Sequence, residues 1–281
     1  MVAAAVAAVA AGASEMSLVH PEFVPDPALS RAEMEALQRD IADAARFTDD
    51  LDFEPTAVSL DDAQSRLGAD PASDADPPVV VGVDQAFVDD RAVSALVAMR
   101  GGTVVERTYA VSPVELPYIP GLLSFREGGA ILKAFETLSV EPDLLVVDGS
   151  GRIHFRQAGL ATHVGVTLGL PAVGVAKGLL CGRPRASLED PLPQGARVPI
   201  EANGRVDAPN GTVIGYAFQS RQYDSGNRYV NPLYVSPGHR VSAETATDLV
   251  ERLCGGYKLP EPTRLADRYA DEAKRDLKRH D

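Results

Sequence analysis

The chain has 281 residues, of which 45% are hydrophobic, enough for one large domain or two small ones. It contains no Trp and only 6% aromatic residues, so aliphatic side chains must fill its core, which favours an α/β protein over a β-sandwich. The net charge of -13 alone would argue against a nucleic-acid partner. However, only five of the 27 basic residues are Lys, and this Asp-rich, Lys-poor composition is typical of adaptation to a high-salt cytoplasm. The charge therefore does not exclude nucleic acid, although high salt weakens each phosphate contact and demands a well-formed local site.

The N-terminal residues 1–13 are an Ala/Val-rich run with no Lys or Arg before Arg31, so they lack the charged start of a signal peptide. The run is also too short to span a bilayer. We predict that residues 1–16 form a disordered extension and that residues 17–281 form a single cytoplasmic domain, acting as a monomer.

Along the first half of the chain, Ser30 and Glu33 form a capping-box pattern before apolar residues at helical spacing, which predicts a helix over residues 31–47. The acidic, Pro-containing stretch 61–78 is typical of a loop. Strands are predicted at 78–84, 92–99 and 103–111, joined by short turns into an antiparallel meander, and a rigid loop at 116–121 then leads into a helix at 124–138.

The second half alternates strands and helices. Residues 144–148 are a continuous apolar strand of the kind buried on both faces. This order predicts a mixed central sheet with helices packed on both faces. The further predicted elements are a helix at 158–168, a strand at 172–176, a hairpin of 214–218 with 233–235, and helices at 243–254 and 263–277.

Two carboxylates follow apolar strands. Asp84 ends the strand 78–84 and Asp148 ends the strand 144–148. If these strands are parallel neighbours, both side chains emerge at the carboxyl edge of the sheet, where open α/β sheets place their sites. Two close carboxylates repel unless a cation lies between them, and Mg²⁺ prefers such oxygen ligands. Glu127, in the first turn of its helix, would add a third carboxylate. The alternative is that each Asp caps a turn and Glu127 only stabilises the helix dipole.

Two other polar residues each allow two interpretations of their role. Lys177 follows the strand 172–176 and suits either a phosphate or the solvated surface. Tyr118, stiffened between Pro117 and Pro120, is either a wedge between bases or a ring packed under its loop.

Three histidines were also considered as site residues. Gly149 and Gly151 precede His154 and would let the backbone approach a ligand closely, or simply form a turn. His163 is better explained as a structural residue of its helix. His239 precedes a helix and could cap it or transfer a proton. Two distant cysteines, Cys181 and Cys254, are expected to be reduced thiols.

Together these segments resemble the endonuclease V family, in the family's order from about residue 78 to residue 268. With the composition, the resemblance predicts a member from a halophilic archaeon. The matching segments are Val81–Asp84, Pro117–Gly121, Leu122–Glu127, Asp148–Gly151, His154, Gly159–His163, Gly174–Lys177, Tyr234–His239 and Pro260–Ala266.

The resemblance implies a ribonuclease H-like fold and an endonuclease, dependent on Mg²⁺ or Mn²⁺, that acts on DNA containing deoxyinosine. The family cuts the second phosphodiester bond 3′ to the lesion and leaves 3′-hydroxyl and 5′-phosphate ends. Asp84 and Asp148 match its metal-binding aspartates, and Glu127 matches its third catalytic carboxylate. The positions around the scissile phosphate are matched by His154, Lys177 and His239.

Tyr118 matches the family's wedge, which fills the gap left when the damaged base turns out of the stack. The pocket that receives the base is matched by Gly121, Leu123, Gly159 and Leu160, with Gly149 and Gly151 beside it. Backbone N–H groups can distinguish hypoxanthine from adenine there, because a carbonyl replaces an amino group.

The chain departs from the family at Gln85, Phe155 and Gly178, and Phe155 puts the geometry of His154 in question. Two other functions remain open: an endoribonuclease on inosine-containing RNA, and a lesion-binding module without catalysis.

Overall fold

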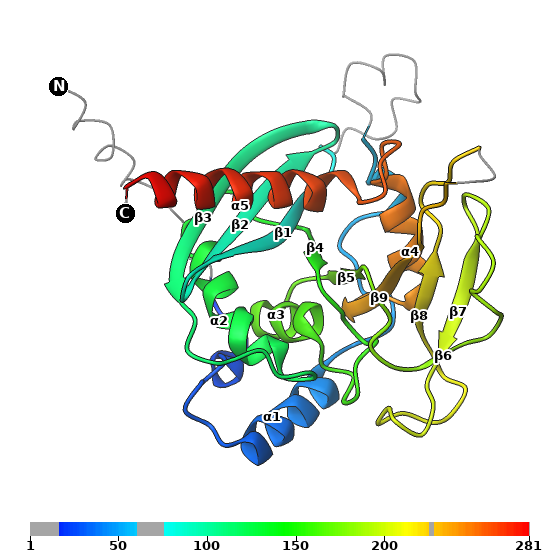
Figure 1. Ribbon diagram of the computed structural model, residues 1–281, viewed down its shortest axis with the longest axis horizontal. Coiled ribbons are helices and arrows are strands. Elements are labelled where there is room, and N and C mark those ends of the chain that lie inside the picture. Colours follow the sequence, from blue (N-terminus) through cyan, green and yellow to red (C-terminus); the bar gives the residue numbers. More distant parts are fainter. Residues whose placement is uncertain (1–16, 61–75, 225–227, 281) are drawn as a thin grey trace.

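The computed structural model describes residues 17–60, 76–224 and 228–280. The predicted extension 1–16 and most of the predicted loop 61–78 lie outside the described residues. Within those described ranges, nine strands form one sheet in the order β3-β2-β1-β4-β5-β9-β8-β7-β6 (Figure 1). The strands are β1 (Val79–Val88), β2 (Arg91–Arg100), β3 (Thr103–Pro113), β4 (Leu144–Asp148), β5 (Ala172–Ala176), β6 (Arg183–Pro184), β7 (Arg197–Glu201), β8 (Val213–Phe218) and β9 (Leu233–His239).

The sheet is mixed, as predicted. β1, β2 and β3 form the antiparallel meander, β1 pairs in parallel with β4, and β4 pairs in parallel with β5. β9 then joins β5 antiparallel and pairs with β8 as the expected hairpin partner. Parallel neighbours β1 and β4 are apolar along their paired residues because helices cover both of their faces.

Helices lie on both faces of the sheet, which confirms the predicted layers (Figure 1). On one face, α2 and α3 pack against Val83 and Val147; on the other, α4 packs against Val80 and Val146. α1 packs against α3 through Ile41. The helices are α1 (Arg31–Ala44), α2 (Leu123–Phe135), α3 (Leu160–Leu168), α4 (Ala243–Arg252) and α5 (Glu261–His280), with 3-10 turns η1 (Pro21–Phe23) and η2 (Pro55–Ala57).

α5 lies directly on β1 and β2, next to α4 on the same face (Figure 1). Small residues at its contact stripe, Ala266, Ala270 and Ala273, allow this close approach. At the tightest point, a Cβ on Gly82 would lie 2.1 Å from the carbonyl carbon of Pro262. Glycine at this position therefore lets α5 begin immediately above β1.

Some element boundaries differ from the sequence predictions. α1 ends at Ala44, three residues early, and the amide of Arg46 donates instead to His239 Nδ1 at 3.2 Å. β1 continues through Asp84 to Val88, because antiparallel pairing with β2 persists after pairing with β4 has stopped. α5 begins at Glu261 and reaches His280, beyond the predicted 263–277. β6 and β7 were not predicted.

No helix among the described residues combines the length and the apolar character that crossing a bilayer requires. Cys181 is a buried free thiol and Cys254 a partly buried one, as expected.

Candidate active site

Asp84 and Asp148 lie on neighbouring strands in register. The last parallel pair of β1 and β4 is Val83 with Val147, so the two aspartates are the next residues along each strand. Alternation along the strands turns both side chains to the same face of the sheet, opposite the face that Val83 and Val147 present to α2 and α3. The sheet therefore brings together the two carboxylates that the sequence singled out.

The two aspartates interact electrostatically. Burial and the adjacent charge of Asp148 raise the pKa of Asp84 to about 8. The amide of Gln85 donates to Asp84 Oδ1 at 2.7 Å and opposes this shift only in part. A half-buried pair of like charges needs a counter-charge to stay ionised.

Lys177 supplies one such counter-charge. Its Nζ lies 2.7 Å from Asp148 Oδ2, at the end of β5. Burial by itself would lower the pKa of Lys177, but the charges of Asp148, Asp84 and Asp267 raise it. The sequence left Lys177 either to a phosphate or to the solvated surface. The structure places its ammonium group against the carboxylates.

Asp267 is a site residue that the sequence reasoning missed. It lies in the second turn of α5, and its charge raises the pKa of Asp84. The matching segment 260–266 stops one residue before it, and α5 turns it toward β1 because it flanks the buried Ala266 and Ala270. That helical phase was the signal that could have revealed it.

Glu127 approaches the site from α2. Burial is the main cause that raises the pKa of Glu127 to about 7. The charge of Arg126 opposes this shift and that of Asp148 adds to it. Gln85, one of the family departures, holds this turn of α2, because its Nε2 donates to the Glu127 carbonyl at 3.2 Å and to Ser94 Oγ at 2.6 Å. Glu127 is thus near Asp148 but belongs to a different element.

The donor chemistry of the aspartate pair fits a hard divalent cation. Two adjacent carboxylates at a sheet edge, one with a strongly raised pKa, are the oxygen ligands that Mg²⁺ takes. Among the described residues, no three His, Cys, Asp or Glu side chains come close enough to enclose an ion by themselves. Mg²⁺ does not require such a cage, since it usually keeps several waters and is bound through one or two carboxylates plus phosphate.

A pocket of about 330 Å³ opens beside the carboxylates. Gly149 and Ser150, which follow Asp148, and Ala176 and Gly178, which flank Lys177, line its near side. The predicted base-binding residues and His154 meet in it, with the N-terminus of α3 at its wall. These predicted lining residues are Tyr118, Gly121, Leu123, Gly149, Gly159 and Leu160.

The loop of Tyr118 is clamped at Gly121. The Gly121 carbonyl accepts hydrogen bonds from Gln38 Nε2 at 3.0 Å, His154 Nε2 at 3.1 Å and Arg156 Nη2 at 3.3 Å. The Phe155 ring packs 3.0 Å from where a Gly121 Cβ would stand, and Gly121 has a φ of +83°, which favours glycine. Tyr118 itself is 64% exposed at the pocket mouth, so it is not packed under its loop.

Both ring nitrogens of His154 are engaged. Its Nδ1 accepts from the Arg156 amide at 3.2 Å, so the neutral ring donates from Nε2 to Gly121. Burial, together with the charge of Arg156, lowers the pKa of His154 to about 4. In this geometry His154 positions the loop.

Three predicted or weighed residues lie outside this cluster. His239 pairs with Ala172 at the start of β5, the end opposite Lys177, so the structure does not bring it to the carboxylates. Gly151 packs against β9, where a Cβ would lie 2.3 Å from the Pro237 carbonyl oxygen. His163 is a buried structural histidine, as predicted, with Nε2 donating to the Phe23 carbonyl at 2.6 Å.

Comparison with known proteins places this site in a family. The sequence pattern of Endonuclease V matches residues 61–268. The chain is 63% identical to Endonuclease V of Haloarcula marismortui over 262 residues, which are 91% of this chain and 97% of that protein. The chain belongs to the endonuclease V family. It is therefore a nuclease of a metal-dependent family, and its sequence is similar to that of a halophilic archaeon's protein, as the composition predicted.

Solved endonuclease V structures share the fold. That of Streptomyces avermitilis is 32% identical, with a TM-score of 0.67, covering 89% of this chain and 95% of the other. That of Ciona intestinalis, in complex with a 24mer DNA containing an inosine followed by a ribo-adenosine, is 24% identical, with a TM-score of 0.64 and coverage of 88% and 98%. These likenesses confirm the predicted ribonuclease H-like fold.

Proposed function

We propose that this endonuclease V nicks DNA at deoxyinosine, hydrolysing the second phosphodiester bond 3′ to the lesion and leaving 3′-hydroxyl and 5′-phosphate ends. One observation carries the proposal: the Asp84–Asp148 pair and the pocket beside it meet at the end of β4, where Gly149 and Ser150 line the pocket directly after Asp148. A flipped base in the pocket would hold its own strand against the carboxylates. The substrate class is supported by the Ciona structure, whose DNA contains an inosine.

We assign cation binding to Asp84 and Asp148, with Mg²⁺ as the ion, replaceable by Mn²⁺. Asp267 adds negative charge near Asp84. When bound, such an ion neutralises phosphate charge and supplies an activated water. Glu127, buried near Asp148, would hold a water or a second ion. Lys177, whose ammonium group lies 2.7 Å from Asp148 Oδ2, would be the positive charge nearest to the bound phosphate.

Recognition is assigned to the pocket and its mouth. Tyr118, exposed on a loop clamped at Gly121, fills the space that the flipped base leaves. Inside, we assign the N–H group that meets the distinguishing carbonyl of hypoxanthine to Leu160, because the neighbouring amides of Gly159 and Ala161 already donate to the Gly151 and Ser150 carbonyls. His154 takes part by fixing Gly121. We further propose that residues 17–281 act as a single, monomeric catalytic domain.

The test is nicking of an oligonucleotide with one deoxyinosine, beside an otherwise identical strand with deoxyadenosine, with Mg²⁺ and after chelation. We expect cutting only of the deoxyinosine strand and only with metal. Asp84→Asn and Asp148→Asn should each abolish cutting while lesion binding persists in Ca²⁺. Near-normal nicking by either variant would refute the assignment.

Inosine-containing RNA is the second candidate substrate, because hypoxanthine is the base in both strands and the DNA of the Ciona complex has a ribo-adenosine after its inosine. Parallel single-turnover assays on deoxyinosine and inosine strands of one sequence separate the two. Binding of the lesion without turnover on either strand would instead support a silent binding module.

A further inference from the structure

α5 continues well beyond the catalytic carboxylates. Asp267 interacts with Asp84, and the helix then runs another thirteen residues to His280. At 1.5 Å per residue, this extends it about 20 Å past the site. The family pattern ends at residue 268, so this extension lies outside the segment that the pattern matches.

The two flanks of α5 face different parts of the molecule. Ala266, Ala270 and Ala273 form the buried stripe on β1 and β2. Tyr269 marks one flank, since its ring meets Tyr109 of the edge strand β3 at a centroid distance of 5.7 Å. Asp267 marks the other flank, which faces the catalytic carboxylates. Asp84 pairs with Ala95 across β1 and β2, and Ala95 packs against Ala270 of α5, so this part of the helix lies over Asp84.

Two lysines lie on the flank of α5 that carries Asp267, called the catalytic flank below. Asp267, Asp271, Lys274 and Lys278 follow one another at spacings of four, three and four residues, which keeps them on one stripe of a helix. Lys274 is about 10 Å and Lys278 about 16 Å along the axis from Asp267. They are two of only five Lys in a chain of net charge -13.

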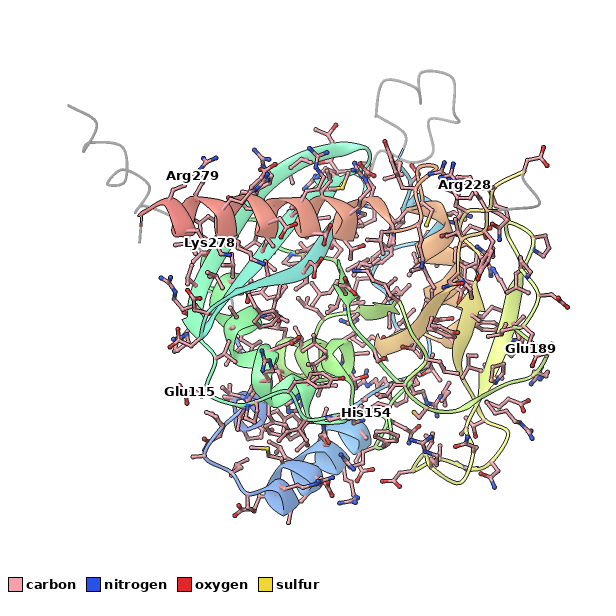
Figure 2. The ribbon with its side chains drawn as sticks, in the orientation of Figure 1. Glu115, His154, Glu189, Arg228, Lys278 and Arg279 are labelled. Carbon is pink, nitrogen blue, oxygen red and sulfur yellow. The ribbon has the colours of Figure 1, made fainter. Side chains whose placement is uncertain are left out.

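The charge on the catalytic flank changes from negative to positive along the helix. Asp267 and Asp271 make its site end acidic, whereas residues 273–280 carry four basic side chains and one acidic one. Where the structure describes side chains, Lys274 and Lys278 form no salt bridge, while Arg279 on the neighbouring stripe pairs with Asp276 at 3.4 Å. Lys278 is exposed and Lys274 is partly exposed. Figure 2 shows Lys278 and Arg279 at the far end of this helix.

We propose that the catalytic flank of α5 is a phosphate rail, on which Lys274 and Lys278 bind the nucleic-acid backbone that extends away from the cleavage site. The ligand is nucleic acid because this flank is continuous with a phosphodiesterase site and its free cations are spaced along a line. Lysine acts as a point charge toward phosphate, so the rail adds affinity without reading sequence. This inference rests on the proposed function for its direction of approach.

The test compares two double variants with equal loss of charge on the same helix. Lys274→Gln/Lys278→Gln removes the rail, and Arg275→Gln/Arg279→Gln is the matched control on the neighbouring stripe. Binding to an undamaged duplex and to the same duplex with one deoxyinosine is measured in Ca²⁺ by fluorescence anisotropy. Salt is varied across the range in which circular dichroism shows each protein folded.

Each phosphate contact contributes about 0.9 to the slope of log K against log salt for a duplex. We therefore expect the rail variant to lose about 1.8 of this slope on both duplexes and the control to lose less than half as much. Nicking of a short deoxyinosine strand at saturation should stay within about twofold of wild type, since neither lysine touches the proposed pocket.

Equal slopes for the rail variant and wild type would overturn the rail, as would an equal loss in the control. Failure of the proposed function is a separate result. If the wild-type protein shows no preference for deoxyinosine, the proposed lesion specificity is wrong. The comparison of salt slopes on the undamaged duplex still tests whether Lys274 and Lys278 bind the backbone. A wild-type protein that binds neither duplex overturns both.

Discussion

Replacing Gln38 by Leu tests how α1 supports lesion recognition. Gln38 is fully buried on α1, and its Nε2 donates to the Gly121 carbonyl at 3.0 Å. Its Oε1 accepts from Arg156 Nε at 2.7 Å. A third, long hydrogen bond joins Gln38 Nε2 to Ser124 Oγ at 3.5 Å. Leucine has a similar volume, so the substitution removes these hydrogen bonds without opening a large cavity.

The cost follows from what each partner loses. A neutral hydrogen bond contributes about 1 kcal/mol, and one to a charged group about 1.5–3 kcal/mol. The Gly121 carbonyl keeps His154 and Arg156 as donors, but the partly buried Arg156 Nε loses its acceptor. We expect Gln38→Leu to lower the free energy of unfolding by about 3 kcal/mol. Because Gly121 anchors the loop of Tyr118, we also expect deoxyinosine binding to weaken about tenfold, or 1.4 kcal/mol.

Urea unfolding followed by circular dichroism measures the first effect, and anisotropy with a deoxyinosine duplex in Ca²⁺ measures the second. Asp40→Leu, an exposed position two residues along the same helix, is the control and should change stability by less than about 0.5 kcal/mol. If Gln38→Leu is as stable as Asp40→Leu, the hydrogen bonds carry no net energy. If stability falls while lesion affinity is kept, α1 does not support the recognition loop.

Three further outcomes are expected. Tyr118→Ala should weaken deoxyinosine binding about tenfold or more, because the ring lies at the pocket mouth. The affinity for Mn²⁺, measured by calorimetry, should stay unchanged. Equal losses of lesion binding and metal binding would exclude a wedge. Gly82→Ala should destabilise the fold by several kcal/mol, because its Cβ would stand 2.1 Å from the Pro262 carbonyl carbon. A midpoint of thermal unfolding equal to that of wild type would show that α5 can shift without cost. Burial lowers the pKa of His163 to about 4 from its ordinary 6.5. Unfolding between these pH values therefore takes up a proton. As a result, the free energy of unfolding should fall by about 3 kcal/mol as the pH drops from 6.5 to 4. His163→Gln should remove that part of the acid dependence in urea titrations at both pH values, and an unchanged dependence would assign it elsewhere.

The meander and the parallel strands were predictable because their signals are local. Apolar runs such as residues 144–148 and the short turns between β1, β2 and β3 mark strands wherever they fall in the fold. The short strands β6 and β7 were missed because β6 has only two residues and β7 contains Pro199, both weak strand signals. α1 was predicted too long because its end is decided by a tertiary contact, the hydrogen bond from Arg46 to His239.

By itself, the sequence determined the layered fold and the two strand-borne aspartates, since hydrophobic periodicity and a polar residue after an apolar run are properties of neighbouring residues. It also determined which residues line the pocket mouth, through segments that match a family. Only the tertiary structure decided that Asp267 joins the carboxylates, that His239 stays away from them, and that Gln38 clamps Gly121. These interactions link residues far apart in the sequence, such as Asp84 and Asp267, which are 183 positions apart. They depend on how helices pack on the sheet, which local spacing does not encode.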